Sequence, residues 1–95
     1  MAAYFIVQLT VNDPETFETY RQQVPATIAK FGGEYIVRGG DMEVIEGEWP
    51  HPRCVVLKFP DAASARAWHG SEDYAGPMAL RHSSAVSNAI LVEGV

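Results

Sequence analysis

Hydrophobic and mixed positions alternate along the first predicted element, Tyr4 to Val11. One face of this segment is purely apolar and consists of Phe5, Val7, Leu9 and Val11. The opposite face combines polar and apolar residues, namely Tyr4, Ile6, Gln8 and Thr10. A period of two residues is typical of a β-strand. The difference between the faces predicts helices packed on one side and a less uniform cover on the other.

The period changes to three and four residues after Asp13 and Pro14. An aspartate can cap a helix, and proline at the first helical position loses no backbone hydrogen bond. The predicted helix carries an apolar stripe of Phe17, Tyr20, Arg21, Val24, Ile28 and Phe31. Pro25 lies within the stripe and removes one backbone hydrogen bond, so we expect a kink or a break just before it. Gly32 and Gly33 then end the helix.

Two short strand-like runs, Glu34 to Arg38 and Met42 to Glu46, flank the sequence Gly39-Gly40-Asp41. They form either a tight hairpin or one strand bent by a bulge, and the pattern is compatible with both. A proline-containing loop then leads to Arg53. A strand is predicted over Cys54 to Phe59, with one face made of Val55, Leu57 and Phe59.

The second half of the chain contains two helical segments and a final strand. The first helix begins at Pro60-Asp61 and ends at Gly70, and its buried stripe is Ala62, Ala65 and Trp68. Ser71 has the character of a new N-cap. Gly76-Pro77 interrupts the segment after it, so we expect regular helix only from Pro77 to His82. The last strand is predicted from about Ser87 to Glu93.

The predicted order is strand, helix, one or two strands, strand, helix with an extension, and strand. This is the split βαβ order of a ferredoxin-like α+β fold, in which an antiparallel sheet carries its helices on one face. At 95 residues the chain is expected to form one domain over residues 1–95. No element remains to cover the second sheet face, which carries Tyr4, Ile6, Gln8, Cys54, Val56 and Ile90. We therefore expect a homodimer in which two sheets stack face to face, with room for a small pocket.

Charge and cysteine content limit the partners and the compartment. The chain has 12 acidic and 7 basic residues, a net charge of −5, and no run of like charge. Nucleic acid is therefore not expected as a partner, because backbone binding needs a basic patch. Cys54 is the single cysteine, which excludes an internal disulfide and favours a reducing compartment. The first residues lack a basic leader and a membrane-length apolar run, so we expect a cytoplasmic protein without a membrane partner.

A family resemblance runs through nearly the whole chain in the right order. It is carried by Asp13-Pro14-Glu15 with Tyr20, Phe31-Gly32-Gly33, Val37-Arg38-Gly39-Gly40, Glu46-Gly47-Glu48-Trp49, Arg53, Phe59-Pro60, Ala67-Trp68, Ser71-Glu72-Asp73-Tyr74, Leu80-Arg81 and Glu93-Gly94. In these blocks the chain resembles the DUF1330 family, whose function is unknown. The resemblance implies a ferredoxin-like fold of the dimeric α+β barrel superfamily and leaves the reaction open.

Arginine and aromatic residues are the candidate ligand contacts. A guanidinium group offers a fixed fork of donors to a carboxylate and stacks on aromatic faces. The predicted substrate-binding residues are Arg38, Trp49, Arg53, Ser71, Tyr74 and Arg81. Each has a structural alternative: Arg38 can pair with Glu46 across two strands, and Ser71 can serve only as a cap. Arg53 and Arg81 lack nearby acids in sequence and are the strongest candidates for anion contacts.

No established catalytic motif is present, so the sequence identifies no catalytic residue. Tyr20 and Tyr74 are either proton donors or ordinary members of an amphipathic core. Cys54 has no histidine beside it, and a buried thiol is usually inert. The histidines, His51, His69 and His82, lack the clustered spacing of zinc ligands and are expected at the surface. Neither a metal nor another cofactor is expected.

Two classes of function remain open at this point. The leading hypothesis is a dimeric small-molecule-binding protein, either a binder alone or a metal-free enzyme acting on a small oxygenated or aromatic acid. It leans on fold analogy with cofactor-free monooxygenases. The alternative is a non-catalytic dimeric interaction module, stress-related or regulatory, whose pocket is packed interface. A haem-linked role would need an axial ligand that the sequence does not identify.

Overall fold

The computed structural model describes residues 1–95 and contains four strands and three helices. In chain order these are β1 (Ala3–Val11), α1 (Pro14–Lys30), β2 (Glu34–Arg38), β3 (Arg53–Phe59), α2 (Ala62–His69), α3 (Glu72–Ser84) and β4 (Ala85–Glu93). Asp13, Asp61 and Ser71 cap the three helices, each accepting a hydrogen bond from the backbone three residues later. None of the helices is long and apolar enough to span a lipid bilayer.

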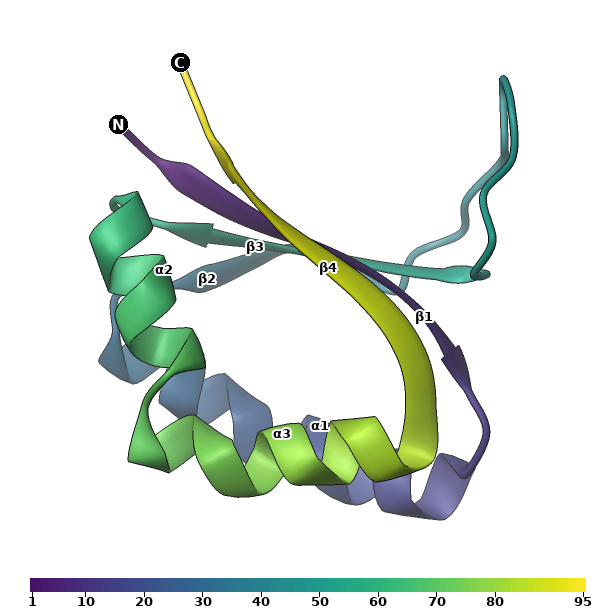
Figure 1. Ribbon diagram of the computed structural model, residues 1–95, viewed down its shortest axis with the longest axis horizontal. Helices are drawn as coiled ribbons and strands as arrows, with labels where there is room; N and C mark the ends of the chain where they lie inside the picture. Colours follow the sequence, from purple (N-terminus) through teal and green to yellow (C-terminus); the bar gives the residue numbers. More distant parts are fainter.

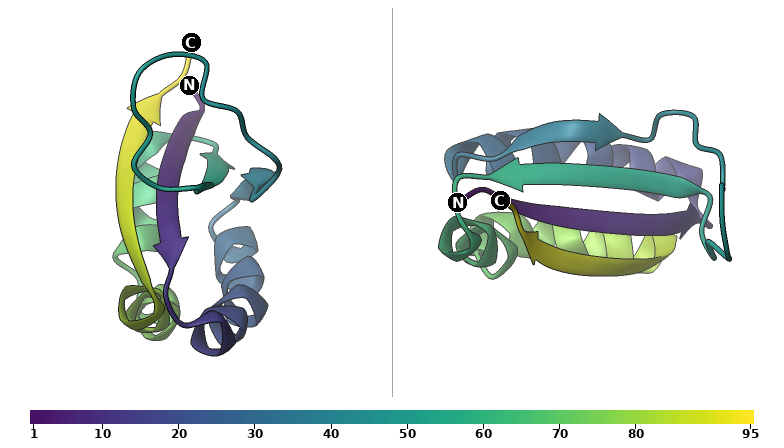
Figure 2. Two further views of the ribbon diagram at one scale, coloured as in Figure 1. Left: turned by 90° about the vertical axis from the view of Figure 1, so that its right-hand side faces the viewer. Right: turned by 90° about the horizontal axis from the view of Figure 1, so that it is seen from above.

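The strands form one antiparallel sheet in the order β2-β3-β1-β4. All three helices lie on the same side of this sheet (Figure 1). Seen from above in Figure 2, the four strands are uncovered and the helices lie behind them. The chain therefore has the predicted ferredoxin-like α+β fold, with one sheet face covered and the other bare.

The strand register decides which residues reach each face. Ile6 in the centre of β1 lies opposite Val56 on β3 and Ile90 on β4, and all three face away from the helices. Several apolar side chains of the bare face are 37 to 56% exposed, namely Val37, Val86, Ile90 and Val92. The 39–52 loop also projects from the sheet on the side away from the helices (Figure 1). The side of the molecule without helices thus carries exposed apolar surface.

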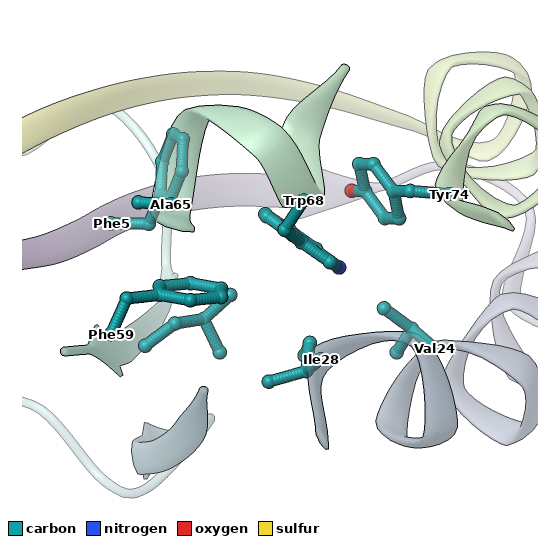
Figure 3. Packing of buried hydrophobic residues seen from close by; sticks show 8 residues of the cluster. Phe5, Val24, Ile28, Phe59, Ala65, Trp68 and Tyr74 are labelled. Atoms are coloured by element: carbon teal, nitrogen blue, oxygen red, sulfur yellow. The ribbon is translucent and has the colours of Figure 1, made fainter. Parts of the chain in front are cut away.

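The core between the sheet and the helices is built around the indole ring of Trp68. Its ring centroid lies 4.1 Å from that of Tyr74 and 5.4 Å from those of Phe5 and Phe59. Figure 3 shows Trp68 between these rings and the aliphatic side chains of α1. The indole Nε1 donates a 3.0 Å hydrogen bond to Thr27 Oγ1. The core therefore satisfies the one polar atom of its largest ring.

Two helices are more regular than the sequence indicated. The predicted break at Pro25 is wrong, because α1 continues through it to Lys30. A proline inside a helix costs about 3 kcal/mol, and burial of Val24 and Ile28 beside it offsets that cost. The interruption expected at Gly76-Pro77 is also wrong: α3 runs from Glu72 to Ser84, and Pro77 belongs to its buried stripe.

The region after β2 differs from both alternatives considered for it. Residues 42–46 form no strand, so they are neither a hairpin arm nor the continuation of a bent strand. β2 pairs with β3 instead, with a register shift between Tyr35 and Val37, and the Gly39 amide donates a last 2.9 Å bond to the Cys54 carbonyl. β4 also starts two residues early, at Ala85, which lies opposite Val11.

Candidate functional site

A cavity of about 40 Å³ lies between the sheet and the helices. Apolar and aromatic side chains form most of its wall, including Phe5, Val7, Leu9, Phe17, Tyr20, Val24, Ile28, Tyr35, Val55, Leu57, Trp68 and Tyr74. A space of this size holds about three water molecules. It is therefore a small pocket, whose shape follows from packing three helices on one sheet face.

The charges around this cavity are all of one sign. Its charged lining residues are Arg21, Arg38, Arg53 and Arg81, and no aspartate or glutamate lines it. The whole chain has only 7 lysines and arginines and a net charge of −5. More than half of the basic residues of an acidic protein thus surround one pocket, which makes it a local site of positive potential.

Arg81 is the most buried of the four arginines, with 6% of its surface exposed. It lies in the last part of α3, where the helix dipole favours a cation. Its Nη1 donates a long 3.4 Å hydrogen bond to Ser87 Oγ, and its Nη2 lies 3.3 Å from His82 Nε2. Its Nε has no partner, and no carboxylate pairs with it. The guanidinium is therefore a buried cation with unused donors.

Arg38 and Arg53 lie beside aromatic rings at another part of the cavity wall. The guanidinium carbon of Arg38 lies 4.5 Å from the Tyr35 ring centroid, and that of Arg53 lies 5.4 Å from that of Phe17. Cation–π contacts of this kind hold the arginines without neutralising their charge.

Arg21 joins this group as its third member. Its Nη1 forms a 3.0 Å ion pair with the exposed Glu18, and its carbonyl accepts a 3.4 Å bond from Arg38 Nη2. Burial, followed by the charges of Arg21 and Arg38, lowers the pKa of Arg53. The three guanidinium groups are thus close enough to repel one another.

The hydroxyl groups of Tyr20 and Tyr74 meet inside the cavity at 3.1 Å. Burial is the main cause that raises the pKa of both phenols, and the charge of Arg81 opposes the rise in each case. Both groups therefore stay protonated at neutral pH. Since one hydroxyl donates to the other, one phenolic hydrogen remains available to a ligand.

His69 also lines the cavity, which corrects the expectation that all three histidines lie at the surface. Its ring stacks on Phe5 at 5.6 Å, and burial, then the charges of Arg81 and His82, lower its pKa. The sequence contained a signal for this position, because His69 follows Ala62 and Ala65 at helical spacing and so shares the buried side of their helix. No group of three or more histidine, cysteine, aspartate or glutamate side chains lies close enough to hold a metal ion.

Four of the six predicted contact residues converge on this cavity: Arg38, Arg53, Tyr74 and Arg81. The predicted Arg38–Glu46 alternative does not form, because Glu46 lies in the 39–52 loop. That loop also carries Trp49, which lines a separate, more open hollow of about 340 Å³ with Cys54.

Ser71 lies outside the cavity and caps α3. Its Oγ accepts a 3.2 Å bond from the Tyr74 amide and donates a 2.7 Å bond to the Trp68 carbonyl. Both contacts are to the main chain, so the hydroxyl positions the helix that carries Tyr74 and Arg81.

Comparison with protein families decides the relationship of this chain. The model of a domain of unknown function, DUF1330, matches residues 2–95. The chain belongs to the DUF1330 family. No curated protein matches it.

Solved structures with a similar fold share little sequence with this DUF1330 protein. One, of unknown function from Rhodopseudomonas palustris, has a TM-score of 0.79 at 12% identity, covering 99% of this chain and 82% of its own. A dimeric ferredoxin-like protein of unknown function from a Jannaschia species has a TM-score of 0.74 at 12% identity, covering 99% and 100%. SnoaB, a cofactor-independent oxygenase from Streptomyces nogalater, has a TM-score of 0.66 at 15% identity, covering 99% and 93%. These likenesses establish the fold.

Proposed function

We propose that this DUF1330 protein binds a small organic acid in the cavity between its sheet and its helices. The observation that carries the proposal is the arginine lining: four guanidinium groups and no carboxylate surround an otherwise apolar and aromatic pocket. Arg81 is the expected anchor for the carboxylate, because it is buried and lacks an acidic partner. A bound carboxylate would supply the missing counter-charge.

The residues that line the cavity limit the chemical character of the rest of the ligand. A guanidinium with a free Nε can pair side-on with a carboxylate through two parallel hydrogen bonds. The phenol pair of Tyr20 and Tyr74 offers one more hydrogen to an oxygen of the ligand. The surrounding aromatic rings favour an apolar or aromatic body. An oxygenated or aromatic acid satisfies all three features.

The size of the cavity limits that ligand. A volume of about 40 Å³ holds a carboxyl group and few further atoms. A larger acid requires movement of side chains at the open side of the pocket, such as the exposed Arg38 and the partly exposed Tyr35. Short acids are therefore expected to bind without rearrangement.

We also propose that the functional unit is a homodimer formed through the bare sheet face. That face exposes Val86, Ile90 and Val92, and an apolar sheet face of this kind usually packs on another layer. A second copy is self-complementary across a two-fold axis. The dimeric neighbour with the same fold supports this arrangement. Each protomer would keep its own pocket, because the cavity lies on the opposite side of the sheet.

Isothermal titration with a panel of short aliphatic and aromatic monocarboxylates tests the binding proposal. Each acid is compared with its neutral amide, which has nearly the same shape and no charge. We expect acids to bind and amides not to bind. The substitution Arg81→Met should reduce acid affinity at least ten-fold without lowering the melting temperature, since it removes an uncompensated buried cation. Acids that bind no better than amides would overturn the proposal.

Arg66→Met is the matched control, because Arg66 is exposed on α2 and does not line the cavity. It should leave affinity unchanged. Any acid that binds can then be incubated aerobically with the protein while dissolved oxygen is followed. Oxygen uptake that depends on Arg81 would favour a metal-free oxygenase, for which the fold of SnoaB provides the precedent. Binding without turnover would favour a binding protein.

A further inference from the structure

We infer that the ligand of this pocket carries two carboxylates, one held by Arg81 and the other by Arg21, Arg38 and Arg53. The inference rests on the proposed binding function and narrows the class of its ligand to dicarboxylic acids. It follows from the arrangement of the arginines in two separate groups with an apolar row between them.

The strand register places the two groups on opposite sides of the cavity. Arg53 on β3 lies opposite Leu9 on β1, and Leu9 lies opposite Ser87 on β4. Since neighbouring strands are about 4.8 Å apart, the backbones of Arg53 and Ser87 are separated by roughly 10 Å. Arg81 is bonded to the Ser87 hydroxyl and therefore lies at the β4 side. The two groups are distinct sites at one level of the sheet.

Each group has hydrogen-bond donors that the protein leaves unused. The Nε atoms of Arg21 and Arg53 are buried without a partner, and so is that of Arg81. Buried donors without partners are uncommon because each loses its hydration. An unused Nε in both groups is accounted for if each group receives a carboxylate from the ligand.

The balance of charge favours a dianion over a monoanion. Arg21, Arg38 and Arg53 have a single carboxylate nearby, Glu18, which bonds only to Arg21 Nη1 and is itself exposed. A monocarboxylate bound at Arg81 would leave the mutual repulsion of these three arginines unrelieved. A second carboxylate among them would be attracted to all three.

The surface between the two groups is apolar. Leu9 stands between Arg53 and Ser87 in the register, and the adjacent row consists of Val55, Val7 and Ala89. This row offers no hydrogen bond to a ligand. Leu9 and Val7 are buried and Phe17 packs against them, so a hydrocarbon spacer or a ring that exceeds the cavity of about 40 Å³ reaches the row only after side chains at the open side of the pocket move. The site thus matches two acidic ends joined by an apolar spacer.

Titration of succinate, glutarate, adipate and isophthalate, each against its own monomethyl ester, tests this inference. The ester keeps the length and one carboxylate and lacks the second charge. We expect at least one diacid to bind ten-fold or more tightly than its ester. Arg53→Gln should abolish that difference by weakening the diacid more than its ester, whereas Arg81→Gln should weaken both. Arg66→Gln is the control and should change neither.

The outcomes separate this inference from the proposed function. If monocarboxylates and esters bind but no diacid is preferred, the two-carboxylate arrangement is wrong and the pocket remains an acid site. If neither diacids nor monoacids bind to the wild type, both proposals fail. Inorganic phosphate can reach only one of the two arginine groups. If phosphate displaced a bound ester completely and bound as tightly as the best diacid, that result would also contradict the inference.

Discussion

Tyr20 on α1 and Tyr74 on α3 are 54 positions apart in sequence, and their hydroxyl oxygens lie 3.1 Å apart. Tyr74 is almost fully buried, and Tyr20 also packs beside Phe17 in the wall of the pocket. The pair joins the two helices at the centre of the candidate site. Its energetic effect depends on both phenols remaining protonated, because a buried phenolate would lose hydration and two phenolates would repel each other.

This pair predicts a loss of stability at high pH. Burial raises the folded-state pKa of Tyr20 and Tyr74 above the ordinary value of 10.0. The contribution to stability is therefore complete below pH 10 and is lost as pH rises toward the folded-state pKa. We expect the free energy of unfolding to fall between about pH 8 and pH 11, and to fall less in Tyr20→Phe. Urea unfolding at the two pH values measures this.

Tyr4→Phe is the control for the alkaline effect, because Tyr4 lies on the bare sheet face and outside the cavity. It should keep the full pH dependence of the wild type. An identical loss of stability in Tyr20→Phe and in the wild type would show that the phenol pair does not control alkaline unfolding.

Removing the Ser71 hydroxyl separates a capping role from a ligand contact. Ser71→Ala should lower the free energy of unfolding by about 1 kcal/mol, because the Tyr74 amide loses its cap. Affinity for the best monocarboxylate should stay within two-fold of wild type, since both hydroxyl contacts are to the main chain. Ser71→Asp retains an N-cap and should recover most of the stability. A large affinity loss in both variants would instead place Ser71 in the binding site.

Gly39 is required for the position of Arg53. Its φ is +70°, and an added Cβ would approach the Arg53 guanidinium carbon to 2.7 Å. Gly39→Ala should therefore cost about 1 to 2 kcal/mol in backbone strain and displace Arg53 from the cavity wall. Thermal unfolding gives the first effect, and the ratio of diacid to ester affinity gives the second.

Gly40→Ala provides the matched comparison for Gly39→Ala. A Cβ at Gly40 has no atom within 4 Å, and its φ lies outside the left-handed range. This variant should be indistinguishable from wild type in both measurements. Equal effects of the two substitutions would mean that general loop flexibility, and not contact with Arg53, controls the site.

A charge in the bare sheet face should separate the proposed dimer. Ile90 is 56% exposed at the centre of β4, opposite Ile6. In a stacked dimer Ile90→Glu would bury two carboxylates without partners, so we expect a monomer in light scattering at concentrations where the wild type is dimeric. Gln22→Glu introduces the same side chain at an exposed position of α1, and this variant should remain dimeric. Dimeric Ile90→Glu would place the interface elsewhere.

Periodicity predicted most of the fold because burial depends on it directly. The alternation of Phe5, Val7 and Leu9 identified the covered face of β1, and these three residues are buried together with Ala3. The interruptions of helices predicted at two prolines were wrong. Pro25 and Pro77 favour interruptions locally, but packing of the surrounding helix against the sheet outweighs the lost hydrogen bond in both cases. Local propensity alone contains no term for that packing.

Part of the lining of the cavity could be predicted from the sequence. Arg53 and Arg81 lack nearby acids in sequence, and both line the cavity without a carboxylate of their own. Trp49 and Ser71 were grouped with them by residue type, yet Trp49 lies in the 39–52 loop and Ser71 caps α3. Residue type indicates what a side chain can bind and does not indicate which cavity it reaches.

The order of elements, the covered face of the sheet and the family are all readable along the chain, because they depend on short-range periodicity and on residues in a set order. The meeting of Tyr20 with Tyr74 and the position of His69 in the pocket appear only once the chain is folded. The same is true of the placement of Arg53 and Arg81 on opposite sides of one cavity. Such distances depend on the register of β1 with both β3 and β4 and on the seating of three helices against the sheet. Contacts between residues that are dozens of positions apart produce no periodic pattern in the sequence.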